Sequence, residues 1–325
     1  MNSTRFTNAL FSAVAALALA NTSCAFAGTP YPVVVGDRWG FADKTGKLVI
    51  NPQFERAGNF ASGLAEVRLG KWGYVDNSGK LAINPQFDEA QSFSEGLAAV
   101  KLDRRYGYIS TDGKYVVNPQ FDSAGRFSEG RAAVKLQRRY GYIDKTGKLI
   151  ITPQFESAAE FSESLAAIEL NNRFGYLDAS GKIVINPQFE SAGPFSGGLA
   201  ELKMAKRWGF IDKTGKIVIN PQFEAASSFV EGLAPARVGN RWGYIDQAGH
   251  LVINPQFDDA TAFSEDLACV RLAGRWGYID KSGKFAINPQ FDDAAPFADG
   301  LARVKVGRKT GYVDANGKYV WNPSN

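Results

Sequence analysis

One short motif returns at a nearly constant interval along the chain. It consists of an aromatic residue, a glycine and a second aromatic residue, and in its ninth copy threonine replaces the first aromatic. The first interval is 33 residues and the other seven are 34. Since a repeat array grows by adding units and not independent domains, this period constrains the fold more than the length of 325 residues does. The copies begin at Trp39, Trp72, Tyr106, Tyr140, Phe174, Trp208, Trp242, Trp276 and Thr310.

Two further motifs keep the same phase. Asn-Pro-Gln-Phe follows each triplet, as at 51–54, with Thr152 in place of asparagine once and a truncated copy at 322–323. A Phe-x-x-Gly-Leu-Ala phrase comes next, as at 93–98. Glycines and an internal proline in every unit disfavour the helical repeats that share this period. Short β-branched clusters such as 216–220 favour strands instead.

Each unit is predicted to contain three β-strands. The first strand holds the triplet and leads through a tight turn such as 212–215, in which aspartate can bond the backbone and glycine can take a positive φ. The second strand is predicted to end at Asn-Pro, because proline cannot donate to a ladder. An irregular segment with two phenylalanines, such as Phe87 and Phe93, then leads to a third strand such as 97–102.

The two ends of the array carry complementary parts of one unit. Residues 31–40 match 234–243, so the array opens with a third strand that lacks its own first two strands. It closes at 310–321 with a first and second strand that lack a third. A split unit suits a ring closed by pairing of the two ends, so we favour an all-β, propeller-like closed ring of about nine units. Propellers usually have roughly four to eight blades of four strands, so an open β-solenoid arc is the alternative.

The repeated phrases together resemble a known family. Trp-Gly-Tyr-Ile-Asp-Lys-x-Gly-Lys, followed by Asn-Pro-Gln-Phe and Phe-Ser-Glu-Gly-Leu-Ala, is similar to the WG repeat of bacteria, over about residues 31–323. The resemblance implies a β-rich array that serves as a binding or interaction module, and no catalytic residue belongs to the repeat. The chain departs from the pattern at positions 106, 140 and 174, which keep apolar bulk, and at Thr310, which loses it.

Residues 1–27 are predicted to be a secretory signal peptide, and residues 28–325 a single repeat array. Arg5 is the one charged residue in the first segment, and 9–20 form an apolar run that is too short to span a bilayer. Residues 25–27 offer an A-x-A cleavage site. No later stretch is apolar enough for a membrane helix. We therefore expect a periplasmic or secreted protein without a transmembrane segment in its mature form.

Lipoprotein anchoring at Cys24 is the alternative, and it is disfavoured because Asn21 stands where a lipobox has an aliphatic residue. If Cys24 is removed with the signal peptide, Cys269 is left without a disulfide partner in the chain. Removal of Arg5 from the 37 basic residues leaves 36 against 33 acidic ones, a net charge of +3. This charge is too small to imply nucleic-acid binding.

The recurring tryptophans invite a glycan-stacking interpretation. However, a residue type that returns in nearly every unit is most simply one that packs between units, and buried aromatic rings carry a large apolar area. We therefore expect a structural role for Trp39, Trp72, Trp208, Trp242 and Trp276.

Two ladders of opposite charge run through the array. A basic residue precedes every triplet and an acidic residue follows every Pro-Gln-Phe, as Arg105 and Asp122 do. One shared period predicts ion pairs between units. The alternative is a charged rim that attracts an anionic partner, and it is strongest where two basic residues adjoin. These candidate rim residues are Arg104, Arg105, Arg138, Arg139, Lys206, Arg207, Arg308 and Lys309.

No catalytic residue, metal site or cofactor is predicted. The one histidine, His250, occupies a turn position that is lysine in the other copies, and the position of Cys269 elsewhere accepts glutamate, alanine or arginine. Neither a Ser-His-Asp set nor a His/Cys metal cluster is supported. We expect a non-catalytic scaffold that binds a protein or a cell-envelope polymer. The alternatives are a glycan-binding module and an envelope hydrolase with a site grafted onto the array.

Overall fold

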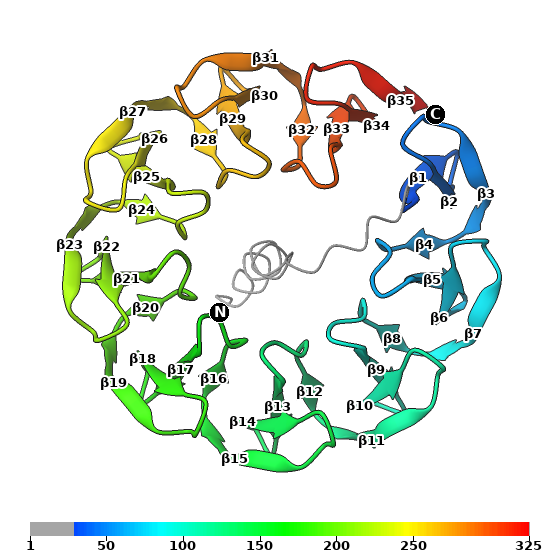
Figure 1. The fold of residues 1–325 in the computed structure, drawn as a ribbon, viewed down its shortest axis with the longest axis horizontal. Helices are drawn as coiled ribbons and strands as arrows, with labels where there is room; N and C mark the ends of the chain where they lie inside the picture. Colours follow the sequence, from blue (N-terminus) through cyan, green and yellow to red (C-terminus); the bar gives the residue numbers. More distant parts are fainter. Residues whose placement is uncertain (1–28, 325) are drawn as a thin grey trace, which may run out of the picture.

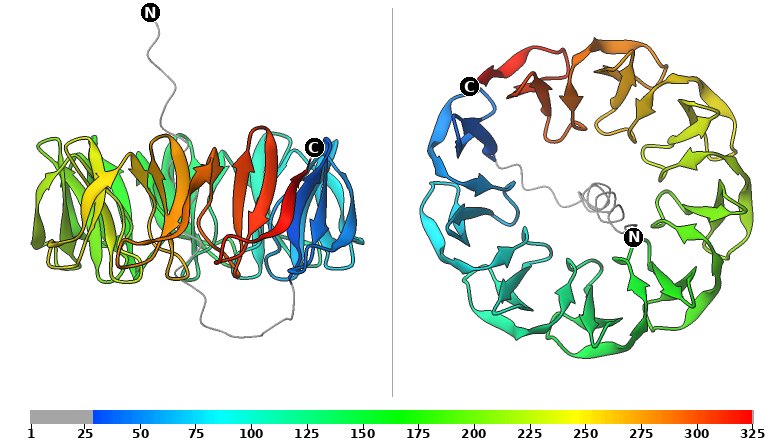
Figure 2. Two further views of the ribbon diagram at one scale, coloured as in Figure 1. Left: turned by 90° about the horizontal axis from the view of Figure 1, so that it is seen from above. Right: turned by 180° about the vertical axis from the view of Figure 1, so that it is seen from behind.

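The computed structural model describes residues 29–324, so the predicted signal peptide and Cys24 lie outside the described residues. Nine small antiparallel sheets stand around a ring, and each contains strands that are consecutive in the chain (Figure 1). Seen from the side, the ring is a short, wide cylinder (Figure 2). The prediction of an all-β, propeller-like closed ring is therefore confirmed, and the open arc is not observed.

Eight blades have four strands, and the first blade has three. We number the blades in chain order, so that blade 1 contains β1–β3, blade 2 contains β4–β7 and blade 9 contains β32–β35. The innermost strands, which blade 1 lacks, are β4 (Arg56–Ala57), β8 (Glu89–Ala90), β12 (Ser123–Ala124), β16 (Ser157–Ala158), β20 (Ser191–Ala192), β24 (Ala225–Ala226), β28 (Asp259–Ala260) and β32 (Asp293–Ala294). The next strands outward are β1 (Tyr31–Val35), β5 (Leu64–Leu69), β9 (Leu97–Leu102), β13 (Arg131–Leu136), β17 (Leu165–Leu170), β21 (Leu199–Met204), β25 (Ala234–Val238), β29 (Ala268–Leu272) and β33 (Ala302–Val306).

The aromatic triplets lie in the third position of each sheet and the Asn-Pro motifs lie at the outer edge. The triplet strands are β2 (Arg38–Ala42), β6 (Lys71–Asp76), β10 (Arg105–Ser110), β14 (Arg139–Asp144), β18 (Arg173–Asp178), β22 (Arg207–Asp212), β26 (Arg241–Ile245), β30 (Arg275–Ile279) and β34 (Lys309–Val313). The outer strands are β3 (Leu48–Phe54), β7 (Leu81–Phe87), β11 (Tyr115–Phe121), β15 (Leu149–Phe155), β19 (Ile183–Phe189), β23 (Ile217–Phe223), β27 (Leu251–Phe257), β31 (Phe285–Phe291) and β35 (Tyr319–Ser324).

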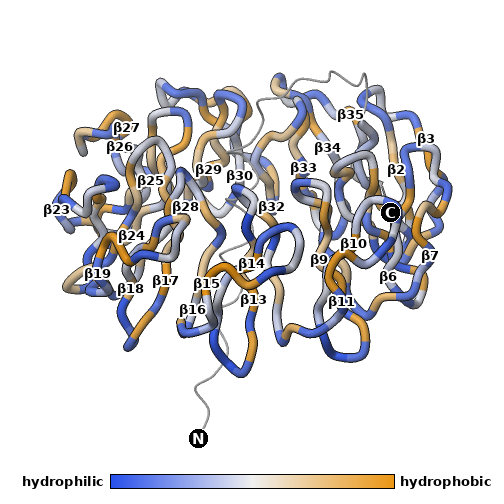
Figure 3. The backbone as a smooth tube through the Cα atoms, turned by 60° about the horizontal axis from the view of Figure 1, so that its bottom comes forward, coloured by the Kyte–Doolittle hydropathy of each residue, from blue (hydrophilic) through white to orange (hydrophobic). Residues whose placement is uncertain are grey.

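The two ends of the cylinder are formed by different loops. The hairpin face holds the turns that enter the triplet strands, such as 103–104 between β9 and β10. The turn face holds the Asp-x-x-Gly turns that leave these strands, and also the inner loops, such as 91–96 between β8 and β9. Hydrophilic residues gather in the loops of both faces, whereas hydrophobic residues follow the strands (Figure 3).

The outer strand does not end at Asn-Pro, so that prediction was wrong. In blade 1, Trp39 pairs with Phe54 and Phe41 pairs with Ile50, so β3 carries a bulge at the proline and then continues. An edge strand tolerates proline because its free side needs no ladder hydrogen bond. The bulge lies directly on the triplet glycine, where a Cβ on Gly40 would come within 2.5 Å of the Ile50 carbonyl oxygen. This close approach explains why every triplet contains glycine.

The hydrophobic core consists of a series of layers between neighbouring blades. Between blades 2 and 3, for example, Tyr74 and Ile83 of one blade pack with Phe93, Val100 and Ile109 of the next. Similar clusters fill the other interfaces. Each blade thus buries its apolar side chains against the adjacent blades, which are its sequence neighbours everywhere except at the ring closure.

The ring closes by side-chain packing. Among the described residues, no sheet combines strands from the two ends of the chain, so the expected pairing of the ends is not observed. Instead, Val33 of blade 1 packs with Tyr312 of blade 9, and the rings of Tyr31 and Tyr312 lie 4.5 Å apart. A Cβ on Gly46 of blade 1 would lie 2.1 Å from the Val320 carbonyl oxygen of blade 9. Each four-stranded sheet begins with the short inner strand that precedes the third predicted strand of a unit. It then contains that third strand and the first two strands of the next unit, so its strands are consecutive in the chain.

Candidate functional site

The second aromatic residue of each triplet is the most deeply buried. Tyr74 of blade 2 is completely buried, and its hydroxyl donates a 2.7 Å hydrogen bond to the Gln91 carbonyl of blade 3. Burial raises the pKa of this hydroxyl far above its usual value. The same bond to the next blade is made by Tyr108, Tyr142, Tyr176, Tyr244 and Tyr278. These aromatic residues therefore fasten blade to blade and are not available to a ligand.

The tryptophans lie at the edge of the same layers. All five predicted positions are half-buried and pack against interblade clusters. The guanidinium of Arg271 lies 5.7 Å from the ring centroid of Trp276, and Arg237 covers Trp242 in the same way. The greater burial of the second aromatic position was not predicted. A signal was present, because that position is tyrosine or phenylalanine in all nine copies whereas the first position includes Thr310.

The structure contains six of the ion pairs that the two charge ladders predict. Arg139 of blade 4, for example, lies 3.1 Å from Glu156 in the connection to blade 5. The same carboxylate accepts a 2.9 Å hydrogen bond from the Asn172 backbone N–H of blade 5. This N–H and the Arg139 guanidinium lower the pKa of Glu156. The other pairs are Lys71–Asp88, Arg105–Asp122, Arg207–Glu224, Arg241–Asp258 and Arg275–Asp292.

All eight candidate rim residues lie on the hairpin face and are exposed, but they belong to separate blades. Blades 3, 4 and 6 carry six of them, and blade 9 carries Arg308 and Lys309. Within the first group, the residue nearer the strand is paired with an acid, as described for the ladders. The residues at the hairpin tips take part in none of the ion pairs found among residues 29–324. These tip residues are Arg104, Arg138 and Lys206.

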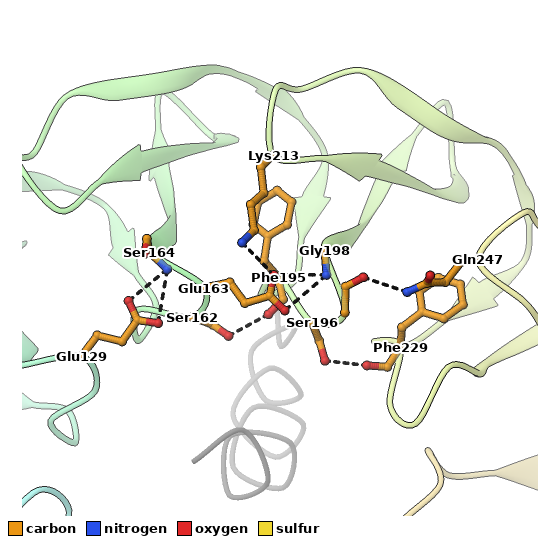
Figure 4. Close-up of polar contacts among 11 residues, drawn as sticks. Glu129, Ser162, Glu163, Ser164, Phe195, Ser196, Gly198, Lys213, Phe229 and Gln247 are labelled. Carbon is orange, nitrogen blue, oxygen red and sulfur yellow. Dashed lines mark hydrogen bonds and ion pairs between the residues drawn. The ribbon is translucent and has the colours of Figure 1, made fainter. Parts of the chain in front are cut away.

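A second polar network joins the inner loops on the turn face (Figure 4). The Glu163 carboxylate of blade 5 accepts a hydrogen bond from the Gly198 N–H of blade 6 and lies 3.0 Å from the Lys213 ammonium of the same blade. The Ser162 hydroxyl donates a 2.7 Å hydrogen bond to the Phe195 carbonyl. The interblade role of these loop glutamates was not predicted, although their recurrence in the Phe-Ser-Glu-Gly phrase indicated a shared structural role.

Two glutamates lie in interblade layers, and Glu201 is the more deeply buried of the two. Glu201 of blade 6 is buried, and its one side-chain partner is the Ser228 hydroxyl of blade 7, at 3.1 Å. Burial raises its pKa to about 7. A Cβ at residue 193 would lie 2.0 Å from the carboxylate, so a larger residue there would force the Glu201 side chain to move. Glu66 repeats this arrangement with Ser92, and its pKa is also raised by burial.

The remaining candidates for chemistry are metal-binding clusters, Cys269 and His250. Residues 29–324 contain no group of three or more His, Cys, Asp or Glu side chains that could hold a metal ion. Cys269 is buried, which raises its thiol pKa to about 12, and such a thiol is a poor nucleophile. His250 is exposed in a turn and lies 3.3 Å from Asp246. Within residues 29–324, no helix is long and apolar enough to span a membrane.

The repeat matches a known family model in eight consecutive stretches. The model describes the WG containing repeat, and the stretches are 39–71, 72–105, 106–137, 140–174, 174–206, 208–242, 242–276 and 276–309. No curated protein matches the chain in sequence.

Solved structures resemble the chain in fold. A structure titled "Crystal structure of the eukaryotic initiation factor" has a TM-score of 0.64 at 10% identity and covers 90% of this chain and 95% of its own. The dihydro-heme d1 dehydrogenase NirN has a TM-score of 0.49 at 13% identity, with 80% and 71% covered. At such low identity, the first structure shows similarity of fold alone. The second is too dissimilar to support a conclusion about this chain.

Proposed function

This chain belongs to the family of WG-containing repeat proteins, and we propose that it is a non-catalytic, exported scaffold that binds a protein or a cell-envelope polymer. One observation carries this proposal. The tyrosine hydroxyls, the paired charges of the two ladders and the inner-loop glutamates are engaged between blades, whereas the tips of the hairpin face are exposed and change in sequence from unit to unit. Function resides in sites and not in folds, so the variable tips are the first place to look for a partner.

The repeated groups leave little reactive surface. The Tyr142 hydroxyl is bonded to the Ala159 carbonyl, the Glu156 carboxylate is shared between two blades, and the Glu163 carboxylate joins neighbouring inner loops. Groups held in this way stabilise a rigid ring. A rigid ring can vary its exposed tips without changing its core, and this is the property that a binding scaffold requires.

Export is part of the proposal and rests on residues 1–27. The full chain expressed in a bacterium should appear outside the cytoplasm with a mature mass that begins at Gly28. A lipid-modified form beginning at Cys24 would replace the soluble exported form with a membrane-anchored one. Full-length protein that stays in the cytoplasm would contradict export.

Binding is tested with the mature protein immobilised and exposed to an envelope extract. We expect one discrete component to be retained in a saturable manner and to be recovered chemically unchanged. A matched column that carries heat-denatured protein should not retain it. Turnover of the retained component would contradict the non-catalytic assignment, and the absence of any specific component would contradict the scaffold.

A further inference from the structure

The nine blades differ most clearly at the tips of the hairpin face. Blades 1, 2, 7, 8 and 9 place glycine in this turn, whereas blades 3 to 6, which run from β8 to β23 in Figure 1, place none there. The glycine-containing tips are Gly36-Asp37, Gly70, Gly239-Asn240, Ala273-Gly274 and Gly307-Arg308. The glycine-free tips are Asp103-Arg104, Gln137-Arg138, Asn171-Asn172 and Ala205-Lys206, and we call these four tips the basic arc.

The backbone of the basic arc is strained where a basic residue takes the second tip position, in blades 3, 4 and 6. Both residues of each of its tips have a positive φ, including 70° at Arg104, 70° at Arg138 and 64° at Lys206. Type I′ turns of this kind prefer glycine and asparagine, because other side chains clash with the backbone there. In blade 8 the same pair of positive φ angles is formed by Ala273-Gly274, so glycine fits the position that Arg104, Arg138 and Lys206 occupy. Strain that persists where a better residue is available points to a functional requirement for the side chain.

The basic arc also carries positive charge that no ion pair among the described residues neutralises, and one carboxylate, Asp103, adjoins Arg104. Arg105, Arg139 and Arg207, one residue beyond each tip, are paired with acids. The exposed side chains at the tips themselves are not in any ion pair found among the described residues. Three cations thus stand on blades 3, 4 and 6, and blade 5 between them carries Asn171 and Asn172 at its tip.

Amide side chains lie between these cations. Gln137 adjoins Arg138, and the tip of blade 5 consists of Asn171 and Asn172. Guanidinium and ammonium groups bind carboxylates, and amides both donate and accept hydrogen bonds to hydroxyls. No tip of the basic arc contains an aromatic ring on which a nucleic-acid base could stack.

We propose that the basic arc binds an anionic polysaccharide. This inference rests on the proposed scaffold function and deepens it by naming the surface and the ligand class. The tips of blades 3, 4 and 6 each present one cation and the tips of blades 4 and 5 present amides, along one curve. Such a surface fits an extended polymer with repeated carboxylates and hydroxyls better than it fits a compact ligand.

The test uses polygalacturonate as the probe, with neutral dextran for comparison, and the mature full-length ring. The wild-type protein should bind polygalacturonate and not dextran, with an affinity that falls as salt rises. The triple variant Arg104→Gly, Arg138→Gly and Lys206→Gly should bind about tenfold more weakly. Its unfolding temperature should be unchanged or higher, because glycine relieves the positive-φ strain.

A matched control removes the same charge from the opposite face of blades 4 to 6. The triple variant Lys148→Ser, Lys182→Ser and Lys216→Ser changes exposed residues of the turn face, none of which is in an ion pair among the described residues. Its affinity for polygalacturonate should stay within about twofold of the wild type. An equal loss of affinity in this control would overturn the proposal, because net charge alone would then explain the binding.

Other outcomes separate the failure of this inference from the failure of the scaffold. If the wild type does not bind polygalacturonate, or the glycine variant binds it equally well, the basic arc proposal is overturned. The scaffold proposal survives that result if an envelope component is still retained. Retention of an acidic protein in place of the polysaccharide, or equal binding of a single-stranded oligonucleotide, would overturn the ligand class.

Discussion

The interface between blades 2 and 3 and the interface between blades 9 and 1 are built from equivalent strands, but they are filled differently. In the first, the Tyr74 hydroxyl reaches the Gln91 carbonyl of an inner loop, and Phe93 of that loop packs 4.9 Å from the Tyr74 ring. In the second, the described part of blade 1 contains no inner strand or loop, and the Tyr312 hydroxyl bonds directly to the Pro32 carbonyl on β1.

The missing inner segment leaves the closing interface less completely covered. Glu201 of blade 6 lies at the interface with blade 7 and is buried. Arg303, at the equivalent position of blade 9, is exposed. Tyr312 retains 8% exposure, whereas Tyr74 has none. Each inner strand and its loop therefore cover the interblade layer next to them and shield it from water. The closing interface relies on packing around Val33 and Tyr312 and on the Tyr312–Pro32 hydrogen bond, and we infer that it is the weakest contact in the ring.

The largest effect is expected from removing the closing contact altogether. Deletion of residues 310–325 removes Tyr312, most of β34 and all of β35, and exposes a face of both end blades. We expect the unfolding temperature, followed by circular dichroism, to fall by more than about 10 °C. The substitution Asn322→Ala, at an exposed position, should leave it unchanged. An unfolding temperature close to that of the wild type would instead indicate an open arc with frayed ends.

The next effect compares the two buried tyrosines directly. Tyr74→Ala should lower the free energy of unfolding by about 4 kcal/mol, and Tyr312→Ala by about 2 kcal/mol, because the second site is less enclosed. Chemical denaturation measures both values. Tyr74→Phe is the matched control and should cost only about 1 kcal/mol, since phenylalanine already occupies this position at Phe41 and Phe210. An equal or greater loss at Tyr312 would contradict a weak closing interface.

A third prediction concerns pH and the sealed position that holds Glu201. Its folded-state pKa of about 7 exceeds the unfolded value, so the folded state favours the protonated acid. Its favourable contribution is complete below about pH 4.5 and is lost as pH rises to about 7, at a total cost of about 3 kcal/mol.

Glu201→Gln should therefore raise stability at pH 8 and flatten this part of the pH profile, as measured by denaturation between pH 4 and pH 8. Arg303→Gln, at the uncovered equivalent position, is the control and should leave the profile unchanged. A profile that keeps its slope in the Glu201 variant would show that the carboxyl group is not sealed from water.

The smallest effect is expected from the exposed ion pairs. Arg139→Gln removes one pair that bridges two internal blades, and it should cost about 0.5 kcal/mol because both partners are solvated. Lys309 of blade 9 is in none of the ion pairs found within residues 29–324, so Lys309→Gln should have no measurable effect. High salt should erase the difference between these two variants. A loss above about 2 kcal/mol for Arg139 would mean that the pair is effectively buried.

Much of this architecture could be predicted from the sequence because the same pattern of motifs returns nine times. The triplets, the Asn-Pro motifs and the split at the ends predict an all-β ring. The inner strands could not be predicted, since two residues such as Glu89 and Ala90 are too few to show an alternating pattern. The course of the outer strand through Pro52 also differed, because its free edge removes the usual penalty for proline.

The candidate surface was only partly visible in the sequence. Adjacent basic residues pointed to the hairpins of blades 3, 4 and 6, but sequence could not separate Arg104, which is free of ion pairs among the described residues, from Arg105, which is paired with Asp122. The positive φ angles of the basic arc are a property of backbone geometry. The interblade role of Glu163 depends on which loops become neighbours, and this follows only from ring closure.

Small-angle X-ray scattering of the mature protein tests most directly whether nine blades close on themselves without any strand shared between the two ends. A closed ring predicts a radius of gyration only a few ångströms above the value of about 19 Å expected for a compact chain of this length. It also predicts a maximum dimension equal to the width of one disc. A markedly larger radius of gyration with an extended tail in the distance distribution would contradict closure.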